Sequence, residues 1–429
     1  MRIRMPGDKS LTQRALIFAA LADGESRLSG LLHGGDAAST AAALRRLGAG
    51  IGALPDDGGE MRVRGAGLRG LRAPDGPLDL GNSGTGTRLL LGVLAGSGLR
   101  VTLTGDDSLR SRPMARVTRP LGQMGATFRE LDRPGRLPLE VRGTHPLRPL
   151  DWDSPVASAQ VKSALLLAGV TGSAFVMVTE PRQSRDHTER MLAHAGSPVI
   201  AHPAAGRWRV ELREPPERLE PLDFRVPGDI SSAAFFLALA SLGGAGDALE
   251  VEDVGLNPTR TGFLRVLRRM GGSVEEHVEQ APHAGEPRGL LVAAPAPLRG
   301  TTVDADEVPG LIDELPLVAA LGARAVGETR ITGAEELRHK ESDRIAATVA
   351  NLRSLGADAE ELSDGLVVQG SDRPLAGRVR TFGDHRIAMA FGVLGALEDN
   401  DVKVDDPGAA AVSFPGFWDL LDAVARRGA

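Results

Sequence analysis

The 429-residue sequence contains no cysteine, no tyrosine and only four lysines. The absence of cysteine excludes disulfides, thiolate metal sites and cysteine nucleophiles, and it fits a reducing compartment. Long apolar runs are also missing: the stretch from Ala233 to Leu242 falls well short of the ~18 residues that a membrane span needs. The first seven residues contain no apolar signal core. We therefore expect a soluble, cytoplasmic protein.

Charge of one sign is not in excess. The 50 Lys and Arg residues against 56 Asp and Glu give a formal net charge of −6, which disfavours a broad nucleic-acid-binding face. The apolar content of 42% excludes a wholly disordered chain, and at roughly 150 residues per domain the length predicts two or three domains. Because almost every basic residue is arginine, each remaining lysine is a stronger functional candidate.

A glycine that follows an amphipathic run recurs along the chain at spacings of 77, 71, 75, 85 and 72 residues. Glycine there is the usual left-handed helix stop. Six unrelated helix ends would be the alternative, but the even spacing favours six repeated units. Helix, short strand, polar loop and second helix alternate in each unit, which predicts an α/β repeat. The glycines are Gly48, Gly125, Gly196, Gly271, Gly356 and Gly428.

A second repeat relates the two halves of the chain. Pro6-Gly-Asp-Lys-Ser10 returns 221 residues later as Pro227-Gly-Asp-Ile-Ser231, and each copy leads into an apolar helix. We expect the serine to cap each helix, and the chain to cross between two halves of three units near residues 226–230. Two cations of the first copy are apolar in the second: Lys9 becomes Ile230 and Arg14 becomes Phe235.

Cationic side chains gather at several predicted helix starts, where free N–H groups and the helix dipole attract anions. Each segment alone could be a solvated surface helix, but together they predict a phosphate or carboxylate site. Arg112 precedes Pro113, which suits a first helical position, so we expect this cation at a helix N-terminus. The segments are Lys9–Arg14, Gly81–Arg88, Arg110–Arg116, Lys340–Arg344 and Asp384–Arg386.

Two further segments carry polar groups suited to binding or proton transfer. Ser158-Ala159-Gln160 supplies neutral hydrogen bonds, although an ordinary capped helix explains it as well. Asp313-Glu314 lies in an apolar stretch, where carboxylates suit general acid–base work. The alternative for Asp313 is an N-cap before a helix that starts around Pro316. A zinc site is not predicted, because no cluster of ligands has suitable spacing.

As an ordered set, these motifs resemble the 5-enolpyruvylshikimate-3-phosphate synthases of the enolpyruvyl transferase family. The resemblance runs from residue 6 to about residue 418. It implies an α/β fold of two similar domains, each of three repeated βαβαββ units in an inside-out barrel-like arrangement, with the active site in the interdomain cleft. The expected domains are residues 1–8 plus 229–429, and residues 9–228. The motifs are Pro6–Ser10, Gly81–Thr85, Arg112-Pro113, Ser158–Gln160, Lys340–Arg344 and Asp384–Arg386.

The resemblance implies transfer of the enolpyruvyl group of phosphoenolpyruvate to shikimate 3-phosphate, with no metal or organic cofactor. Asp313, Glu341 and Lys9 would be catalytic. Shikimate 3-phosphate would be bound by Lys9, Ser10, Arg14, Ser158, Ala159, Gln160, Arg185, Asp313 and Lys340. Phosphoenolpyruvate would be bound by Lys9, Gly84, Arg112, Gln160, Arg344 and Arg386. We expect a monomer that binds neither nucleic acid nor membrane and, because Gly84-Thr85 keeps the pattern of sensitive relatives, is inhibited by glyphosate.

The sequence departs from the pattern of some family members at several positions. A C-terminal lysine that would contact phosphoenolpyruvate is absent near Val412; the other changes are Gln13, Ala159, Arg185 and Glu336. The rival of the same fold, a UDP-N-acetylglucosamine enolpyruvyl transferase, usually shows Lys-Asn near its start and a loop cysteine, both missing here. A non-catalytic anion-binding scaffold is the other alternative, and the intact Asp313 and Glu341 argue against it.

Overall fold

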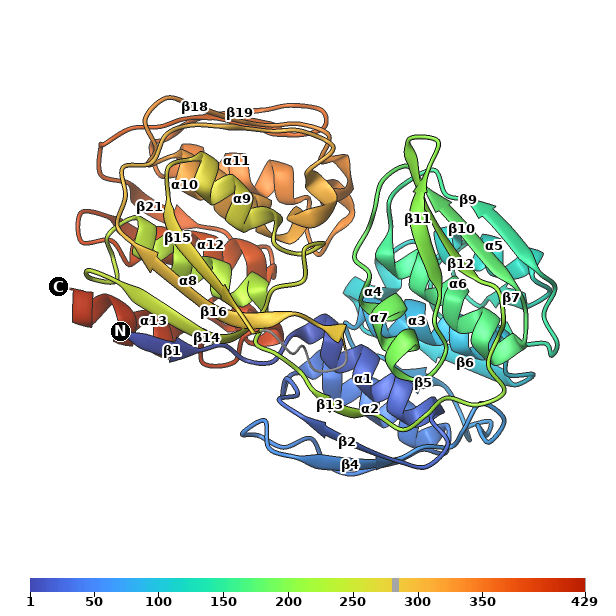
Figure 1. Ribbon diagram of the computed structural model, residues 1–429. Helices are drawn as coiled ribbons and strands as arrows, with labels where there is room; N and C mark the ends of the chain where they lie inside the picture. Colours follow the sequence, from blue (N-terminus) through green and yellow to red (C-terminus); the bar gives the residue numbers. More distant parts are fainter. Residues whose placement is uncertain (280–284, 429) are drawn as a thin grey trace. The chain divides into compact units, whose positions relative to one another are not determined.

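The computed structural model describes residues 1–279 and 285–428, and the predicted α/β class is confirmed. The chain divides into two compact units (Figure 1). Unit 2 contains Gly7–Val226 together with Gly285 and Glu286. Unit 1 contains Met1–Pro6 and the other described residues from Pro227 onward.

Each unit is built from copies of one sheet-and-helix repeat. The first copy in unit 2 consists of β13 (Asp223–Arg225), α1 (Lys9–Leu21), β2 (Glu25–Ser29), α2 (Gly35–Arg46), β3 (Gly50–Ile51) and β4 (Met61–Arg64). The second consists of β5 (Leu78–Asp79), α3 (Gly84–Ala95), β6 (Arg100–Thr104), α4 (Asp107–Ser111), α5 (Ala115–Gln123), β7 (Thr127–Glu130) and β8 (Leu139–Arg142). The third consists of β9 (Leu150–Asp153), α6 (Ala159–Gly172), β10 (Val176–Glu180), α7 (His187–His194), β11 (Ile200–Ala204) and β12 (Arg207–Leu212).

The first copy in unit 1 consists of β1 (Arg2–Arg4), α8 (Ile230–Ser241), β14 (Leu249–Gly255), α9 (Gly262–Arg269), β15 (Ser273–Val278) and β16 (Arg288–Ala294). The second, in which η marks a 3-10 helix, consists of β17 (Thr302–Val303), η2 (Val308–Gly310), η3 (Ile312–Glu314), α10 (Leu315–Gly322), β18 (Glu328–Ile331), η4 (Glu335–His339), α11 (Arg344–Ser354), β19 (Asp358–Glu361) and β20 (Leu366–Gln369). The third consists of β21 (Ala376–Val379), α12 (His385–Gly395), β22 (Asp401–Val404), η5 (Pro407–Val412) and α13 (Phe417–Gly428).

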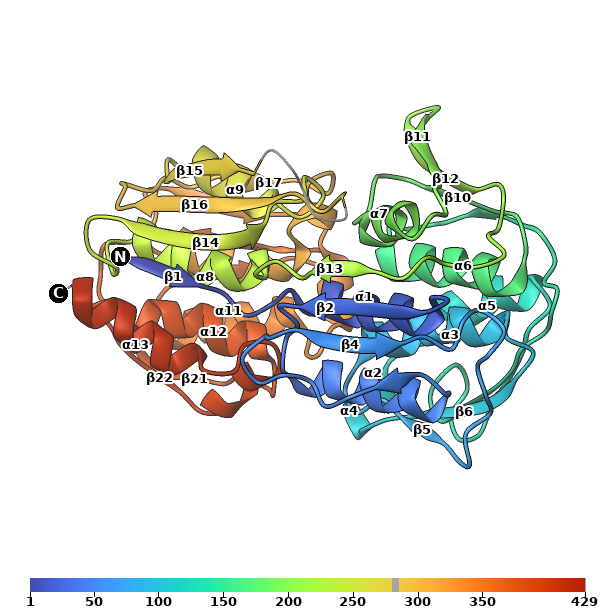
Figure 2. The same cartoon turned by 60° about the horizontal axis from the view of Figure 1, so that its bottom comes forward.

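The sheets show the repeat directly. Five sheets have four strands in one order, in which the first strand runs parallel to the second and the remaining pairs are antiparallel. Within the described part of the chain, the sixth sheet has only β21 and β22. The first strand of two sheets comes from a distant segment: β1 pairs with β14, and β13 pairs with β2 (Figure 2).

Three largely apolar helices are buried on nearly every face and form the centre of each unit: α1, α3 and α6 in unit 2, and α8, α10 and α12 in unit 1. Small residues let them approach closely. A Cβ on Gly92 of α3 would lie 2.1 Å from the carbonyl oxygen of Ala164 in α6. This close packing fixes the N-termini of the central helices, where the predicted polar segments lie.

Helix ends follow the sequence signals with two corrections. Gly48, Gly125, Gly196, Gly271 and Gly356 each have a positive φ directly after a helix, as predicted, whereas Gly428 is the last residue of α13. The predicted serine caps of α1 and α8 are wrong. Asp8 and Asp229 cap these helices instead, because a carboxylate at the first non-helical position reaches the free N–H groups of the first turn. No described helix is long and apolar enough to cross a membrane.

Candidate active site

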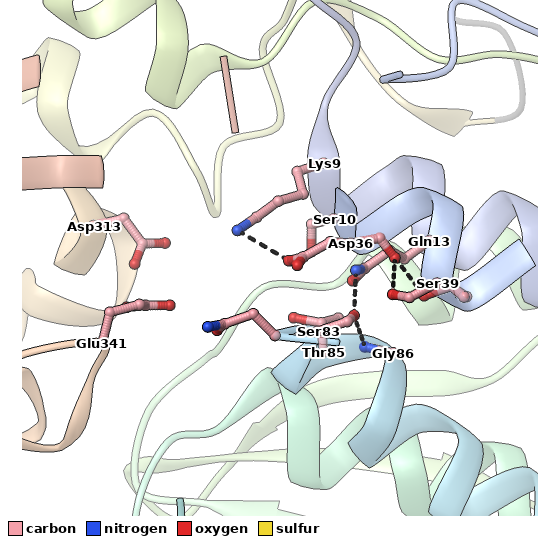
Figure 3. Close-up of polar contacts among 12 residues, drawn as sticks. Lys9, Ser10, Gln13, Asp36, Ser39, Ser83, Thr85, Gly86, Asp313 and Glu341 are labelled. Atoms are coloured by element: carbon pink, nitrogen blue, oxygen red, sulfur yellow. Dashed lines mark hydrogen bonds and ion pairs between the residues drawn. The ribbon is translucent and has the colours of Figure 1, made fainter. Parts of the chain in front are cut away.

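In unit 2, Lys9 is the first residue of α1. Its Nζ lies 3.4 Å from the Oδ2 of Asp36, a buried carboxylate in the first turn of α2 (Figure 3). Asp36 therefore sets the position of the ammonium group. One turn further along α1, Gln13 donates to the hydroxyl of Ser83, which in turn accepts from the Gly86 N–H and caps α3. The starts of α1, α2 and α3 are thus joined by polar side chains.

Arg14 is almost fully buried, and its guanidinium is engaged by three hydroxyls. It donates to Ser10 Oγ at 2.7 Å, Thr188 Oγ1 at 2.9 Å and Ser163 Oγ at 3.1 Å. Burial lowers the pKa of Arg14 to about 10, so the side chain is charged at neutral pH. The structure therefore shows Arg14 as a link between α1, α6 and α7 that orients the half-buried Ser10.

The start of α3 is joined to α6 through Gln160. The Nε2 of Gln160 donates to Thr85 Oγ1 at 2.9 Å, and its Oε1 accepts from Arg88 Nη1 at 2.8 Å. A Cβ on Gly84 would lie 3.0 Å from Arg112 Nη1 and 3.1 Å from Arg88 Nη1, so a larger residue here would displace the ends of these two side chains. Two guanidinium groups therefore border the Gly84 backbone.

Arg112 is not at a helix N-terminus as predicted. It is the C-cap residue of α4, and α5 begins at Ala115 with Met114 as its cap. The short helix α4 was missed in the sequence, and the cation lies at the end of that helix where the dipole favours it. The guanidinium donates to Asn82 Oδ1 and to Ser108 Oγ.

Ser158 caps α6 and Ala159 is its first residue. The Ser158 N–H donates to Glu180, which also pairs with the fully buried Lys162 at 3.1 Å. Lys162 pairs with Glu189 of α7 at 2.7 Å as well. Although burial alone would lower it, these two carboxylates raise the pKa of Lys162. Lys162, prominent in the sequence as one of four lysines, thus holds the polar start of α6 in place.

Arg185, half-buried, precedes α7, and its positive charge acts on Arg14 by lowering the pKa of that guanidinium further.

In unit 1, the buried guanidinium of Arg344 gathers three carboxylates. It donates to Asp384 at 2.8 Å, to Glu341 at 2.7 Å and to Asp313 at 3.4 Å. Burial opposes the charge, but Asp384 and Glu341 raise the pKa of Arg344, and Arg344 in turn outweighs burial to lower the pKa of Asp384. Figure 3 shows the Asp313 and Glu341 carboxylates pointing the same way. The N-cap alternative for Asp313 is wrong, because Glu314 is the residue before α10.

Lys340 adjoins this cluster. Burial lowers the pKa of its ammonium, and the negative charges of Asp313 and Glu336 oppose that shift. Glu336, one of the departures from the family pattern, therefore helps to keep Lys340 protonated.

Arg386, in the first turn of α12, is 5% exposed. Its Nε and Nη1 atoms are buried and have no hydrogen-bond partner among the described residues. Its guanidinium carbon lies 5.9 Å from the centre of the Phe235 ring. Buried donors of this kind cost free energy unless an acceptor arrives, so Arg386 is suited to an anionic ligand.

A family model described as EPSP synthase (3-phosphoshikimate 1-carboxyvinyltransferase) matches residues 1–421. The chain belongs to the EPSP synthase family. The 3-phosphoshikimate 1-carboxyvinyltransferase of Alkalilimnicola ehrlichii is 49% identical to it over 98% of this chain and 92% of the relative. The 3-phosphoshikimate 1-carboxyvinyltransferase of Gloeobacter violaceus is 47% identical over 99% of this chain and 96% of the relative.

Solved structures agree with this family. The EPSP synthase structure from Acinetobacter baumannii has a TM-score of 0.84 and 36% identity, with 99% of this chain and 95% of that chain covered. The enolpyruvyl transferase NikO of Streptomyces tendae has a TM-score of 0.75 at 20% identity, over 100% and 94%, and so shares the fold.

Near Val412, where some family members have a lysine, the described segment η5 contains no cationic residue. Val412 is the half-buried last residue of η5, and the next side chain is the buried Ser413. Sequence reasoning missed Asp36, Arg88 and Asp384 as polar partners of the site. Arg88 and Asp384 lie inside the quoted motifs, but nothing local marked Asp36, whose pairing with Lys9 depends on how α1 packs on α2.

Proposed function

We propose that the protein transfers the enolpyruvyl group of phosphoenolpyruvate to the 5-hydroxyl of shikimate 3-phosphate and releases phosphate. The observation that carries this proposal is the Arg344 cluster, which draws Asp313 and Glu341, the two carboxylates that the reaction needs, together on one guanidinium. Membership of the EPSP synthase family supports the same reaction.

The binding roles follow from charge. Two donor atoms of Arg386 have no acceptor among the described residues, and Arg112 lies beside Gly84. These two cations suit the phosphate and carboxylate of phosphoenolpyruvate, together with Lys9, Gln160 and Arg344. The groups suited to shikimate 3-phosphate are hydroxyls, an amide, a backbone N–H, a carboxylate and cations: Lys9, Ser10, Arg14, Ser158, Ala159, Gln160, Arg185, Asp313 and Lys340.

In the proposed reaction, the oxygen of the 5-hydroxyl of shikimate 3-phosphate bonds to C2 of phosphoenolpyruvate, and Asp313 removes the proton of that hydroxyl. Glu341, with Lys9, delivers a proton to the C3 methylene, which becomes a methyl group in a tetrahedral intermediate. The C2–O bond to phosphate then breaks, and return of a C3 proton to the Glu341 carboxylate restores the double bond. Fixed cations stabilise the departing phosphate.

The first test is phosphate release from phosphoenolpyruvate by the purified protein. Release that requires shikimate 3-phosphate supports the proposal, whereas release only with UDP-N-acetylglucosamine supports the rival transferase. Absence of release with either acceptor, by a folded protein that still binds shikimate 3-phosphate, supports the anion-binding scaffold. A parallel reaction in excess chelator should run at the same rate, because the proposed chemistry uses no metal or organic cofactor.

Three further expectations accompany this proposal. Glyphosate should reduce the rate in competition with phosphoenolpyruvate, and an undiminished rate during titration would contradict it. Sedimentation should give the mass of a monomer. Cell fractionation should find the protein in the cytoplasm.

A further inference from the structure

The second copy of the repeated helix start contains a buried polar network that the proposed reaction does not use. Ser231, fully buried in the first turn of α8, donates its hydroxyl proton to Glu314 Oε1. The same hydroxyl oxygen accepts from Arg260 Nη2 at 2.8 Å. Arg260 also lies 3.3 Å from Asp229, the cap of α8. A chain of bonds therefore runs from Arg260 through Ser231 to Glu314.

This chain ends next to Asp313. Ile312–Glu314 form a single 3-10 turn directly before α10, with Asp313 half-buried and Glu314 only 2% exposed. Because the two residues share a peptide unit, a fixed Glu314 side chain restricts the backbone that carries Asp313. On its other side, the Asp313 carboxylate is bound by Arg344.

A second contact braces the same loop. A Cβ on Gly262, the first residue of α9, would lie 2.8 Å from the carbonyl carbon and oxygen of Gly310. The segment that carries Arg260 therefore approaches residues 308–314 at two places, through the Ser231 hydroxyl and through the Gly262 backbone.

We propose that Arg260, Ser231 and Glu314 form a positioning network that holds Asp313 in the orientation needed to remove the substrate proton. The inference rests on the proposed role of Asp313. The hydrogen bonds that join these buried side chains restrict their orientation, and proton transfer is sensitive to displacements of about 1 Å. None of the three side chains is needed to touch substrate.

Comparison with Ser10 supports a positioning role. Ser10 occupies the equivalent place in the first copy, also beside a buried arginine, but it is half-buried and its proposed partner is the ligand. Ser231 is wholly buried, and its hydroxyl donates a hydrogen bond to a carboxylate of the protein. The same serine has a different partner in each copy.

The test compares Ser231→Val with Ser231→Thr, two side chains of equal size that differ in the hydroxyl. We expect kcat of the valine variant to fall about tenfold to a hundredfold, as for other residues that orient a reacting group. The dissociation constant for shikimate 3-phosphate should stay within about twofold. The threonine variant should recover most of the rate. Ser241→Val is the control, because Ser241 is a buried serine of α8 whose hydroxyl donates within its own helix.

The decisive measurement repeats Ser231→Val in an Asp313→Asn background under single-turnover conditions. If the network acts through Asp313, the second substitution adds little further loss, because the two effects are not additive. A full additional loss overturns the inference, as does a valine variant with the wild-type kcat. Ser231→Ala gives the same comparison if thermal unfolding shows that Ser231→Val does not fold. Absence of turnover by the wild type overturns the proposed function, and the inference with it.

Discussion

The helix starts at α1 and α8 share a sequence and a local structure but differ in chemistry. In both, the aspartate of Pro-Gly-Asp caps the helix and a buried arginine donates to the serine two residues later. At α1 that arginine is Arg14, from the same helix. At α8, Phe235 stands in its place, and the arginine is Arg260 from the segment before α9.

The two copies of the motif therefore have the same backbone conformation at the helix start, while the charged residues of the motif differ. In the first copy, Lys9 is the first residue of α1, and its ammonium group lies next to Asp36. The second copy replaced it with Ile230, a core residue of unit 1, and directed its serine to Glu314. In the proposed function, both units supply cations, unit 2 adds most of the neutral hydrogen-bonding groups, and unit 1 adds the carboxylates for proton transfer.

The largest effect should come from the carboxylates of unit 1. Asp313→Asn and Glu341→Gln remove a proton acceptor or donor with little change in shape, so each should lower kcat by about 10²- to 10⁴-fold. Binding of shikimate 3-phosphate, measured by titration calorimetry, should be largely retained. Near wild-type turnover in either variant would remove that residue from the proposed chemistry.

The next effect concerns stability. Asp384→Asn removes the negative charge of the most buried of the three carboxylates that pair with Arg344, and it should lower the unfolding free energy in denaturant titrations by about 1.5–3 kcal/mol. Because the pKa of Asp384 is lowered in the folded protein, its contribution is complete above about pH 4, the value for an unfolded aspartate, and is lost as the pH falls through the folded pKa. The gap between wild type and variant should narrow in acid; a constant gap would contradict this.

A smaller effect should follow from exchanging the two copies. Lys9→Ile should lower kcat/KM by about 10- to 100-fold, because a charge-assisted bond to substrate contributes roughly 1.5–3 kcal/mol. The reverse change, Ile230→Lys, buries a cation in the apolar core and should lower Tm. Equal activity losses in both variants would show that the copies are not divided as proposed.

The smallest effect is a shift on the alkaline side of the rate profile. Burial lowers the pKa of Lys340, so it should lose its proton below pH 10.5, the usual value for lysine, and kcat/KM should fall there. Lys340→Arg keeps its charge throughout this range and should remove that limb. If kcat/KM of the arginine variant still falls in the same alkaline range, the decrease is caused by the titration of another group.

Much of the fold could be predicted from local signals. The regular glycines marked helix ends correctly at five positions because a left-handed residue after a helix strongly favours glycine. Arg112 was misplaced because the short helix α4 has too few residues to show a periodicity. The serine caps were misplaced because aspartate and serine are both good caps, and the sequence alone does not decide between two such residues that stand two positions apart.

By itself, the sequence determined the α/β repeat, the duplicated helix starts and the set of charged segments, since these depend on periodicity and on motifs only a few residues long. The tertiary structure decided which of those charges meet. Asp36 pairs with Lys9, Arg344 pairs with Asp313 and Asp384, and Ser231 donates a hydrogen bond to Glu314, and in each case the two partners lie more than 25 residues apart in the sequence. Such pairings depend on helix packing within a few ångströms, which no local pattern specifies.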